Sequence, residues 1–408
     1  MSETIIESAA DGAGTPPRLL RLATPATVDV FTRILTHGPI ARIDITRQTG
    51  LSAAAVTKAV APLLAAGFLT DSEPAPTVAA VPGRPSQPLR VVPDALLALG
   101  VKINADEIIG VATTLQMSIL RAVHRRLPST GVLTVVEEVV AVVEELLREL
   151  GPAADRVRGI GVSASGDVDS LHGIIRRSPL LGWTGVPLGE LLENRLKRPV
   201  LVDNDVRALT IAEEWFGVGV DAESFAIVTI GSGIGCGLYI NGDVVSGARG
   251  LAGELGHLPL APEEFLCACG LRGCVETVTS SSAILAAVRR ELGDPELTLA
   301  RAVELAREGD PVAVDVFGRA GRLLGKAIAT MVNLVGPEIV LVMGESAPDY
   351  DVYEQHLRES FEQHAFGAAV ECRIITRPHQ FDDWARGAAA SVVRAIVRHA
   401  HPQLSRTG

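Results

Sequence analysis

The chain has 408 residues, which is too long for one small domain and predicts two or three folding units. Of these residues 47% are apolar and 4% are aromatic, a composition that fits the buried aliphatic strands of an α/β fold. Residues 1–14 lack the charged start and apolar run of a signal peptide, and no run of roughly 18 uncharged apolar residues follows, so we expect a cytoplasmic protein without membrane contact.

The net charge of −11 is distributed unevenly along the chain. Residues 17–92 contain eight Arg or Lys and four Asp or Glu, whereas residues 93–408 are strongly acidic. A basic segment attached to an acidic body is typical of a protein that binds DNA through one part only. Chance variation in local composition explains the charge pattern, taken alone, equally well.

The first elements in chain order are short and helical. Residues 1–24 predict a disordered tail. Apolar residues at helical spacing predict a first helix over 27–35, and Gly38-Pro39 interrupts the chain before a second helix over 41–48. Gly50 supplies the left-handed residue that ends this second helix.

A third helix is predicted to follow Ser52, which is a good N-cap. The apolar face of this helix consists of Val56, Val60, Leu63 and Leu64. The opposite face consists of Ala53, Ala54, Thr57 and Lys58. Because Pro62 removes a helical hydrogen bond, we expect the helix to kink or end near it.

Two short helices joined by a glycine turn, followed by strands at 68–70 and 89–92, predict a mainly α winged helix-turn-helix over residues 25–92. Its partner is then double-stranded DNA. The residues expected to contact DNA are Ser52, Ala53, Thr57, Lys58 and Arg84, the last held extended by the proline after it. The alternative is a three-helix scaffold that packs on the rest of the chain.

From residue 93 onward strands alternate with helices, which predicts α/β architecture in two lobes with a cleft between them. We expect a small lobe over 93–205, completed by a C-terminal helix at 388–404, and a large lobe over 206–387. The predicted strands are 95–103, 108–115, 158–166, 200–205, two within 226–242, and 338–344. The predicted helices are 134–150, 277–292, 298–308, 312–334 and a final one over 383–399.

A cysteine cluster predicts a metal site in the large lobe. His257 is followed by Cys267, Cys269 and Cys274, with glycines between the cysteines that let the loop fold back. Three thiolates and one imidazole complete a closed tetrahedral site, so we predict structural zinc. The alternative, a group of buried free cysteines, does not account for three thiols so close together.

Polar residues near predicted strand ends suggest a ligand site. Asn204 and Asp205 end a strand, where α/β proteins bind ligands, although an Asx turn or a helix cap explains the pair as well. Glu254 and Glu276 flank the metal loop, where a stiffened loop can hold carboxylates for sugar hydroxyls; singly, each resembles a solvated surface charge. The glycine-rich turn after Gly231 fits either a phosphate cradle or a hairpin.

Taken together, the stretch from Gly253 to Glu276 (GELGH, then CACGLRGCVE) and the N-terminal helices resemble the ROK family of repressors, open reading frames and sugar kinases. The resemblance covers about residues 20–400. It implies a two-lobed actin-like, ribonuclease H-like sugar-kinase fold behind the winged helix-turn-helix. It assigns zinc to His257 and the three cysteines. It assigns sugar binding to Asn204, Asp205, Glu254, His257 and Glu276.

The sequence departs from the kinases of this family at the phosphate loop. Their D-x-G-G-T pattern is replaced by Lys102-Ile-Asn104-Ala105-Asp106, which lacks both glycines and adds a carboxylate. The strand end at Val342-Met343-Gly344 has lost part of its glycine pattern, and Arg207 stands in the sugar motif. The Asp that serves these kinases as general base corresponds to Asp205, which we expect to be vestigial.

These features together predict a sugar-responsive DNA-binding regulator, a repressor of carbohydrate-metabolism genes, and not an enzyme. Its effector is expected to be a sugar or sugar phosphate bound in the inter-lobe cleft. Relatives of this type imply a homodimer or homotetramer. The alternative is an active ATP-dependent sugar kinase.

Overall fold

The computed structural model describes residues 5–8, 18–72, 87–377 and 380–398 of the chain. Its contacts divide the chain into two compact units, one formed by Met1–Val220 with Trp384–Gly408 and the other by Asp221–Asp383. This division falls later in the chain than the lobe boundary predicted after residue 205.

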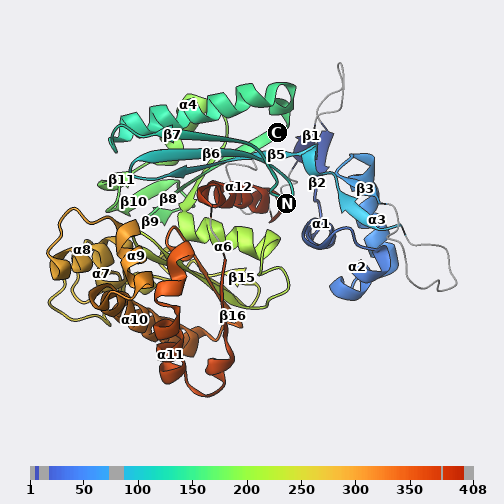
Figure 1. Cartoon of the computed structure of the whole chain (residues 1–408). Helices are drawn as coiled ribbons and strands as arrows, with labels where there is room; N and C mark the ends of the chain where they lie inside the picture. Colours follow the sequence, from blue (N-terminus) through green and yellow to red (C-terminus); the bar gives the residue numbers. More distant parts are fainter. Residues whose placement is uncertain (1–4, 9–17, 73–86, 378–379, 399–408) are drawn as a thin grey trace. The chain divides into compact units, whose positions relative to one another are not determined.

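The N-terminal region of the first unit is helical (Figure 1). It contains α1 (Pro25–His37), α2 (Arg42–Thr49) and α3 (Ala53–Ala65). α3 includes Pro62 and ends three residues later at Ala65, so the helix does end near the proline, as predicted. Leu63, beyond the proline, is buried on the apolar face, and its packing favours the last turn of the helix.

Two small sheets accompany these helices. β3 (Leu69–Asp71) pairs antiparallel with β4 (Leu89–Val91), and Ile40 adds a bridge to Leu89. β1 (Ile5–Ser8) pairs antiparallel with β2 (Arg18–Arg21). Leu20 and Leu22 are buried, so the predicted tail over 1–24 includes an ordered segment.

The main sheet of the first unit has the strand order β12-β8-β5-β6-β7. β5, β8 and β12 run parallel to one another, while β5, β6 and β7 run antiparallel. The strands are β5 (Leu97–Ile103), β6 (Glu107–Thr114), β7 (Ile119–Arg126), β8 (Val157–Ala164) and β12 (Val200–Asn204). A smaller sheet in the same unit contains β9 (Asp167–Asp169), β10 (Ile174–Ser178) and β11 (Trp183–Val186).

Helices cover both faces of the main sheet, because β5, β6, β8 and β12 are largely buried and apolar, whereas the edge strand β7 is mostly exposed. α4 (Val132–Leu150) packs on one face, and α12 (Phe381–Arg398) and α6 (Asp205–Phe216) pack on the other (Figure 1). Gly100 permits the close approach of α12, since a Cβ there would stand 1.9 Å from the carbonyl oxygen of Ala385. α5 (Leu188–Leu196) precedes β12.

The second unit contains a five-stranded sheet of order β15-β14-β13-β16-β17. Its parallel part is β13-β16-β17, and its antiparallel part is β13-β14-β15. The strands are β13 (Phe225–Ile230), β14 (Ile234–Ile240), β15 (Asp243–Val244), β16 (Ile339–Met343) and β17 (Arg373–Thr376). The helices are α7 (Glu276–Thr279), α8 (Ser281–Leu292), α9 (Leu299–Glu308), α10 (Pro311–Val335) and α11 (Glu354–His364).

The single helix predicted over 277–292 is therefore two helices. Ser280 has extended backbone angles between α7 and α8, and its hydroxyl accepts the N–H of Ala283 as the N-cap of α8. Among the residues that the structure describes, no helix is both long and apolar enough to cross a membrane.

Candidate functional site

The first group of predicted ligand residues lies where β12 ends and α6 begins. Asn204 is the N-cap of α6: its side-chain oxygen accepts the N–H of Arg207 at 3.1 Å. Its side-chain nitrogen donates to the Gly166 carbonyl at 3.0 Å. The helix-cap explanation for Asn204 therefore holds, and a ligand contact would have to use the remaining hydrogen-bonding capacity of this amide.

Asp205 is buried and forms an ion pair that the sequence motifs did not reveal. One carboxylate oxygen accepts the N–H of Val206 at 2.9 Å, and the other accepts a hydrogen bond from the Lys102 ammonium. Lys102 is 3% exposed and Asp205 is 6% exposed. The ammonium also lies 5.2 Å from the centre of the Trp384 ring, within the range of a cation–π contact.

The Lys102–Asp205 ion pair determines which charges lie at this strand end. A buried charge is stable only when it is paired, so each member holds the other in the interior. The Asp205 carboxylate consequently faces a cation of the chain itself. The signal for this pair in the sequence is a lone lysine inside the aliphatic run of β5.

Arg207, the residue that departs from the sugar motif of the family, is also neutralised within the first unit. Its guanidinium pairs with Asp203 and with the Ser170 hydroxyl, and it donates to the Val168 carbonyl at 3.4 Å. The Arg207 side chain is 11% exposed, so it serves mainly to hold the strand end together.

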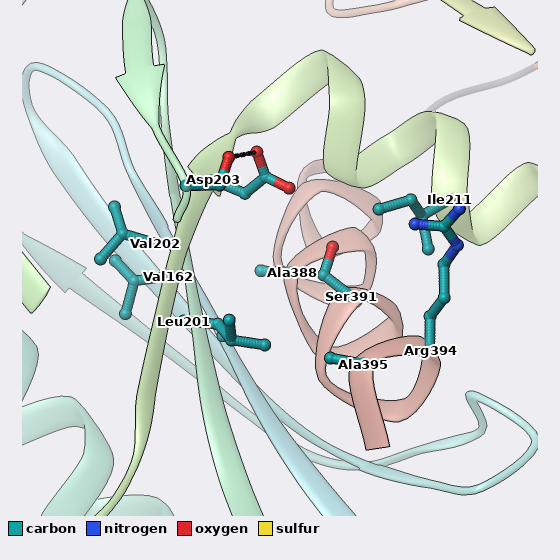
Figure 2. Close-up of a pocket in the computed structure, with 11 residues that line it drawn as sticks. Val162, Leu201, Val202, Asp203, Ile211, Ala388, Ser391, Arg394 and Ala395 are labelled. Atoms are coloured by element: carbon teal, nitrogen blue, oxygen red, sulfur yellow. Dashed lines mark hydrogen bonds between the residues drawn. The ribbon is translucent and has the colours of Figure 1, made fainter. Parts of the chain in front are cut away.

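A cavity of about 110 Å³ lies beside this strand end, between the main sheet and helices α6 and α12 (Figure 2). Aliphatic side chains such as Val162 and Leu201 line one side, and Asp203, Ser391 and Arg394 supply polar groups. None of the predicted sugar ligands lines this cavity, so it is separate from the predicted sugar site.

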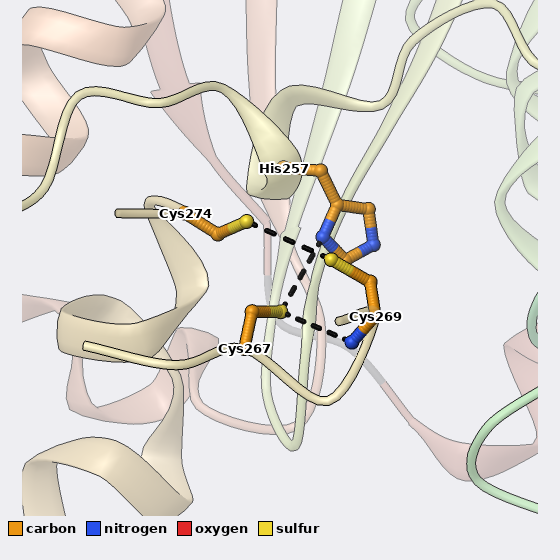
Figure 3. A group of neighbouring side chains, drawn as sticks. All are labelled: His257, Cys267, Cys269 and Cys274. Carbon is orange, nitrogen blue, oxygen red and sulfur yellow. Dashed lines mark hydrogen bonds between the residues drawn. The ribbon is translucent and has the colours of Figure 1, made fainter. Parts of the chain in front are cut away.

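The predicted metal ligands come together in the second unit. One ligand atom from each of His257, Cys267, Cys269 and Cys274 lies within 4.8 Å of the others (Figure 3). The sulfurs of Cys269 and Cys274 are 3.7 Å apart, and Nδ1 of His257 is 3.7 Å from the Cys267 sulfur. A tetrahedral site with metal–sulfur bonds of about 2.3 Å has sulfurs about 3.8 Å apart, so the cluster has the dimensions of a metal site.

The loop that carries these ligands folds back on itself. Pro259 bridges to Cys274 and Leu266 bridges to Arg272, and the Cys267 N–H donates to the Leu271 carbonyl at 2.8 Å. Gly273 has a φ of +72°, and a Cβ there would meet the Ala261 carbonyl oxygen at 2.8 Å.

Both predicted carboxylates of the second unit face the imidazole of His257. Glu276 lies 3.6 Å from Nδ1, and Glu254 lies 3.8 Å from Nε2. The Cys267 thiol also donates to Glu276 at 2.8 Å. Burial raises the pKa of the Cys267 and Cys274 thiols, and a bound divalent cation would reverse this by favouring the thiolates.

The predicted ligand residues thus form two groups. Asn204 and Asp205 are adjacent in the first unit, and Glu254, His257 and Glu276 are adjacent in the second. The stretch aligned with the kinases' phosphate loop begins at the end of β5 and continues through a bend to β6, where the Asn104 N–H donates to the Glu107 carbonyl and Asp106 is exposed.

Four of the five predicted DNA contacts lie at the start of α3. The Ser52 hydroxyl accepts the N–H of Ala55 at 3.2 Å, and Ser52, Ala53, Thr57 and Lys58 are all exposed. Val56 and Val60 on the opposite face are buried, as predicted. Arg84 lies outside the described residues.

Comparison with known proteins identifies two kinds of relative, transcriptional regulators and sugar kinases. The sequence model of the ROK family matches residues 98–395, more than half of the chain. The chain is 29% identical over 376 residues to the DNA-binding transcriptional dual regulator NagC of Escherichia coli K12, covering 90% of this chain and 92% of NagC.

The similar solved structures also include both regulators and kinases. A ROK family transcriptional regulator, described as a homologue of the E. coli Mlc protein, has a TM-score of 0.77 and 27% identity, covering 91% of this chain and 96% of that one. A ROK family glucokinase from Streptomyces griseus, solved with glucose and AMPPNP, has a TM-score of 0.63 and 26% identity. It covers 72% of this chain and 98% of the glucokinase. The regulators therefore match more of the chain than the kinase does.

Proposed function

The chain belongs to the ROK family, and from this membership we propose that it is a sugar-responsive DNA-binding transcriptional regulator, a repressor of carbohydrate-metabolism genes. The observation that carries the proposal is the extent of the similarity. Regulators match 90% or 91% of the chain, whereas the glucokinase structure matches 72% of it, although nearly all of the glucokinase is covered.

We propose that residues 25–92 form a winged helix-turn-helix. α2 and α3 are joined at Gly50, which has a left-handed φ of +69°, and the β3–β4 pair supplies the strands of the wing. The small exposed residues at the start of α3 allow its backbone to approach the major groove, with Thr57 and Lys58 reaching bases or phosphates. Arg84 would extend from the wing into a minor groove.

A homodimer or homotetramer would read a two-fold symmetric operator. Two recognition helices related by two-fold symmetry contact half-sites separated by about one helical turn of DNA, roughly 34–36 Å, or a multiple of it. The operator is accordingly expected to be a pseudo-palindrome.

The effector proposed for this regulator is a sugar or sugar phosphate. Its predicted contacts are Asn204, Asp205, Glu254, His257 and Glu276. The carboxylates accept hydrogen bonds from hydroxyl groups, while the amide both donates and accepts, which suits a polyol. A sugar changes DNA affinity only if it binds one arrangement of the protein better than another.

The metal proposed for the cysteine cluster is structural zinc, held by His257, Cys267, Cys269 and Cys274. Three sulfurs and one nitrogen are the donor set that zinc prefers in closed tetrahedral sites. The ion would supply no chemistry beyond fixing the loop. With Nδ1 of His257 directed at the cluster, Nε2 is left on the side of Glu254.

We propose that sugar phosphorylation is absent or vestigial. General-base catalysis requires a carboxylate that can take a proton from the sugar hydroxyl. Here the Asp205 carboxylate is held by the Lys102 ammonium, and the phosphate loop has no glycine. Phosphoryl transfer depends on positioning and neutralising the nucleotide's charge, which this loop does not support.

The proposal is tested by a gel-shift titration of the full chain on genomic fragments that flank its gene. A specific complex whose affinity falls with salt is expected. A coupled kinase assay across common hexoses and their N-acetyl derivatives runs in parallel and should stay at background. No specific complex, together with ATP-dependent turnover that Asp205→Asn abolishes, would make the chain a kinase instead.

A further inference from the structure

A second strand edge, in the second unit, has the architecture of an anion site. The parallel strands β13 and β16 end side by side, and the turn Gly231–Gly233 connects β13 to β14. The Ser346 N–H donates to the Ile230 carbonyl at 3.0 Å, which continues the parallel pairing past the end of β16. Anionic ligands of open α/β sheets bind at such carboxyl-terminal strand ends.

The N-terminus of α8 meets the same edge. The Ser281 N–H donates to the Gly231 carbonyl at 2.8 Å, and the hydroxyls of Ser281 and Ser346 are 2.7 Å apart. Helix N-termini and glycine turns both present backbone N–H groups that favour negative charge.

A carboxylate of the chain itself lies against the glycine turn. The Oε2 atom of Glu345 lies 1.6 Å from the point where a Cβ at position 231 would stand. Gly344, just before it, has a φ of +104°, and a Cβ there would meet the Ile230 carbonyl oxygen at 2.5 Å. The backbone bend at Gly344 therefore brings Glu345 onto the turn.

A second carboxylate lies on the other side of this turn. Oε2 of Glu276 is 3.6 Å from the Cβ position of Gly233. A phosphate group brought to the turn would thus meet one carboxylate near residue 231 and another near residue 233. Like charges repel at short range, so both carboxylates oppose the binding of a phosphate here, although the exposure of Glu345 to solvent weakens its share.

We propose that Glu345 is the residue that excludes nucleotide phosphates from the glycine turn, by filling the position that a phosphate would take. The inference rests on the proposed function, because a regulator without phosphoryl transfer does not need to bind a phosphate at this turn. Glu345 then acts as a specificity-determining residue: the second unit rejects nucleotide, and cellular ATP does not interfere with the response to sugar.

The experiment compares three full-length, metal-loaded variants with the parent chain by calorimetric titration with ADP. Glu345→Gly removes both charge and bulk, and Glu345→Gln removes the charge only. Glu362→Gln, on the exposed surface of α11, is the matched control. Melting temperature and operator binding confirm that each variant is folded.

We expect Glu345→Gly to bind ADP at least about tenfold more tightly than the parent, the change expected when one like charge near a phosphate is removed. The ADP affinity of Glu345→Gln should lie between those of the parent and Glu345→Gly, and the affinity of Glu362→Gln should equal that of the parent. Adenosine, which has no phosphate, should bind all four proteins equally.

Equal ADP affinity in parent and Glu345→Gly, including no binding by either, would overturn the proposal, because another feature would then control nucleotide access. A gain that appears equally with adenosine would also overturn it, because the gain would then not depend on the phosphate. Operator binding and sugar response, measured on the same samples, report separately on the proposed function.

Discussion

The two groups of predicted sugar ligands are held in place by different forces. Asn204 and Asp205 stand at the junction of a strand and a helix, fixed by cap hydrogen bonds and by a buried ion pair with Lys102. Glu254 and Glu276 stand on either side of His257, next to the cysteine loop and in contact with the imidazole. One group is built from secondary structure, and the other depends on a cluster whose dimensions suit a metal ion.

This difference implies different vulnerabilities. Removing metal should disorder the second group and leave the first intact, because no metal ligand lies in the first unit among the described residues. Breaking the ion pair should destabilise the region around Asn204 and Asp205 and leave the metal loop intact. The two groups should therefore respond independently to these two changes.

Metal removal should have the largest effect. Structural zinc sites contribute on the order of 10 kcal/mol to the folding of the segments they organise. We expect Cys274→Ser, or treatment with a strong chelator, to abolish thermal stabilisation by sugar and to raise hydrogen exchange between residues 254 and 276. Exchange in α4 and β8 should stay near the parent level.

Cys372→Ser is the matched control, because Cys372 is a half-buried cysteine outside the cluster. It should keep about one zinc per chain in elemental analysis, by the four-ligand rule. A Cys274→Ser protein that keeps both its metal and its sugar response would contradict the assignment of the site.

Breaking the ion pair should have the next largest effect. Lys102→Met leaves Asp205 buried without its partner, which typically costs about 3–5 kcal/mol of unfolding free energy. Asp205→Asn should also destabilise the chain, whereas the double variant should recover much of the loss, since replacing both members of a buried pair is often nearly neutral. Denaturant unfolding of the four proteins measures the coupling.

If the two single effects simply add in the double variant, the pair has no energetic role. The metal content of all four proteins should equal that of the parent, and a loss of zinc in Lys102→Met would show that the two groups are not independent.

A smaller effect separates the cap role of Asn204 from a ligand role. Asn204→Ser keeps a side-chain oxygen at the N-cap and loses only the hydrogen bond to Gly166, whereas Asn204→Ala loses the cap as well and should cost about 1 kcal/mol more than the serine variant. Because serine lacks the amide, we expect Asn204→Ser to weaken thermal stabilisation by sugar. Unchanged sugar stabilisation in this variant would assign Asn204 to the cap alone.

Substitutions in α3 should have the smallest effect on the two groups of sugar ligands, because α3 contains neither group. Lys58→Ala should weaken DNA binding by a similar factor for all sequences and reduce the slope of log affinity against log salt by about 1. Sugar stabilisation should be unaffected. Lys326→Ala, an exposed lysine of α10, is the control and should change neither measurement. An unchanged salt slope in Lys58→Ala would remove this residue from the DNA contacts.

Much of this structure could be predicted from the sequence, because the decisive signals are local. The spacing of His257 and the three cysteines predicted ligand atoms that do come within 4.8 Å of one another. The apolar spacing in α3 predicted which face is buried. Membership of the ROK family followed from the Gly253–Glu276 motif and is confirmed by the match over 98–395.

The contacts that escaped prediction join residues far apart in the chain. Lys102 and Asp205 are brought together by the parallel order of β5, β8 and β12, which no local pattern encodes. The same holds for Glu345 on the turn at Gly231, which requires the parallel register of β13 with β16.

In the proposed function, a sugar controls the affinity of this chain for DNA. The most direct test is a fluorescence-anisotropy titration of operator DNA with the parent protein, repeated across a panel of sugars and sugar phosphates at fixed salt. We expect at least one compound to change the apparent Kd by about tenfold or more, a shift of about 1.4 kcal/mol, and Glu254→Gln with Glu276→Gln to suppress that change without altering Kd in its absence. DNA affinity that no sugar or sugar phosphate alters would contradict the account.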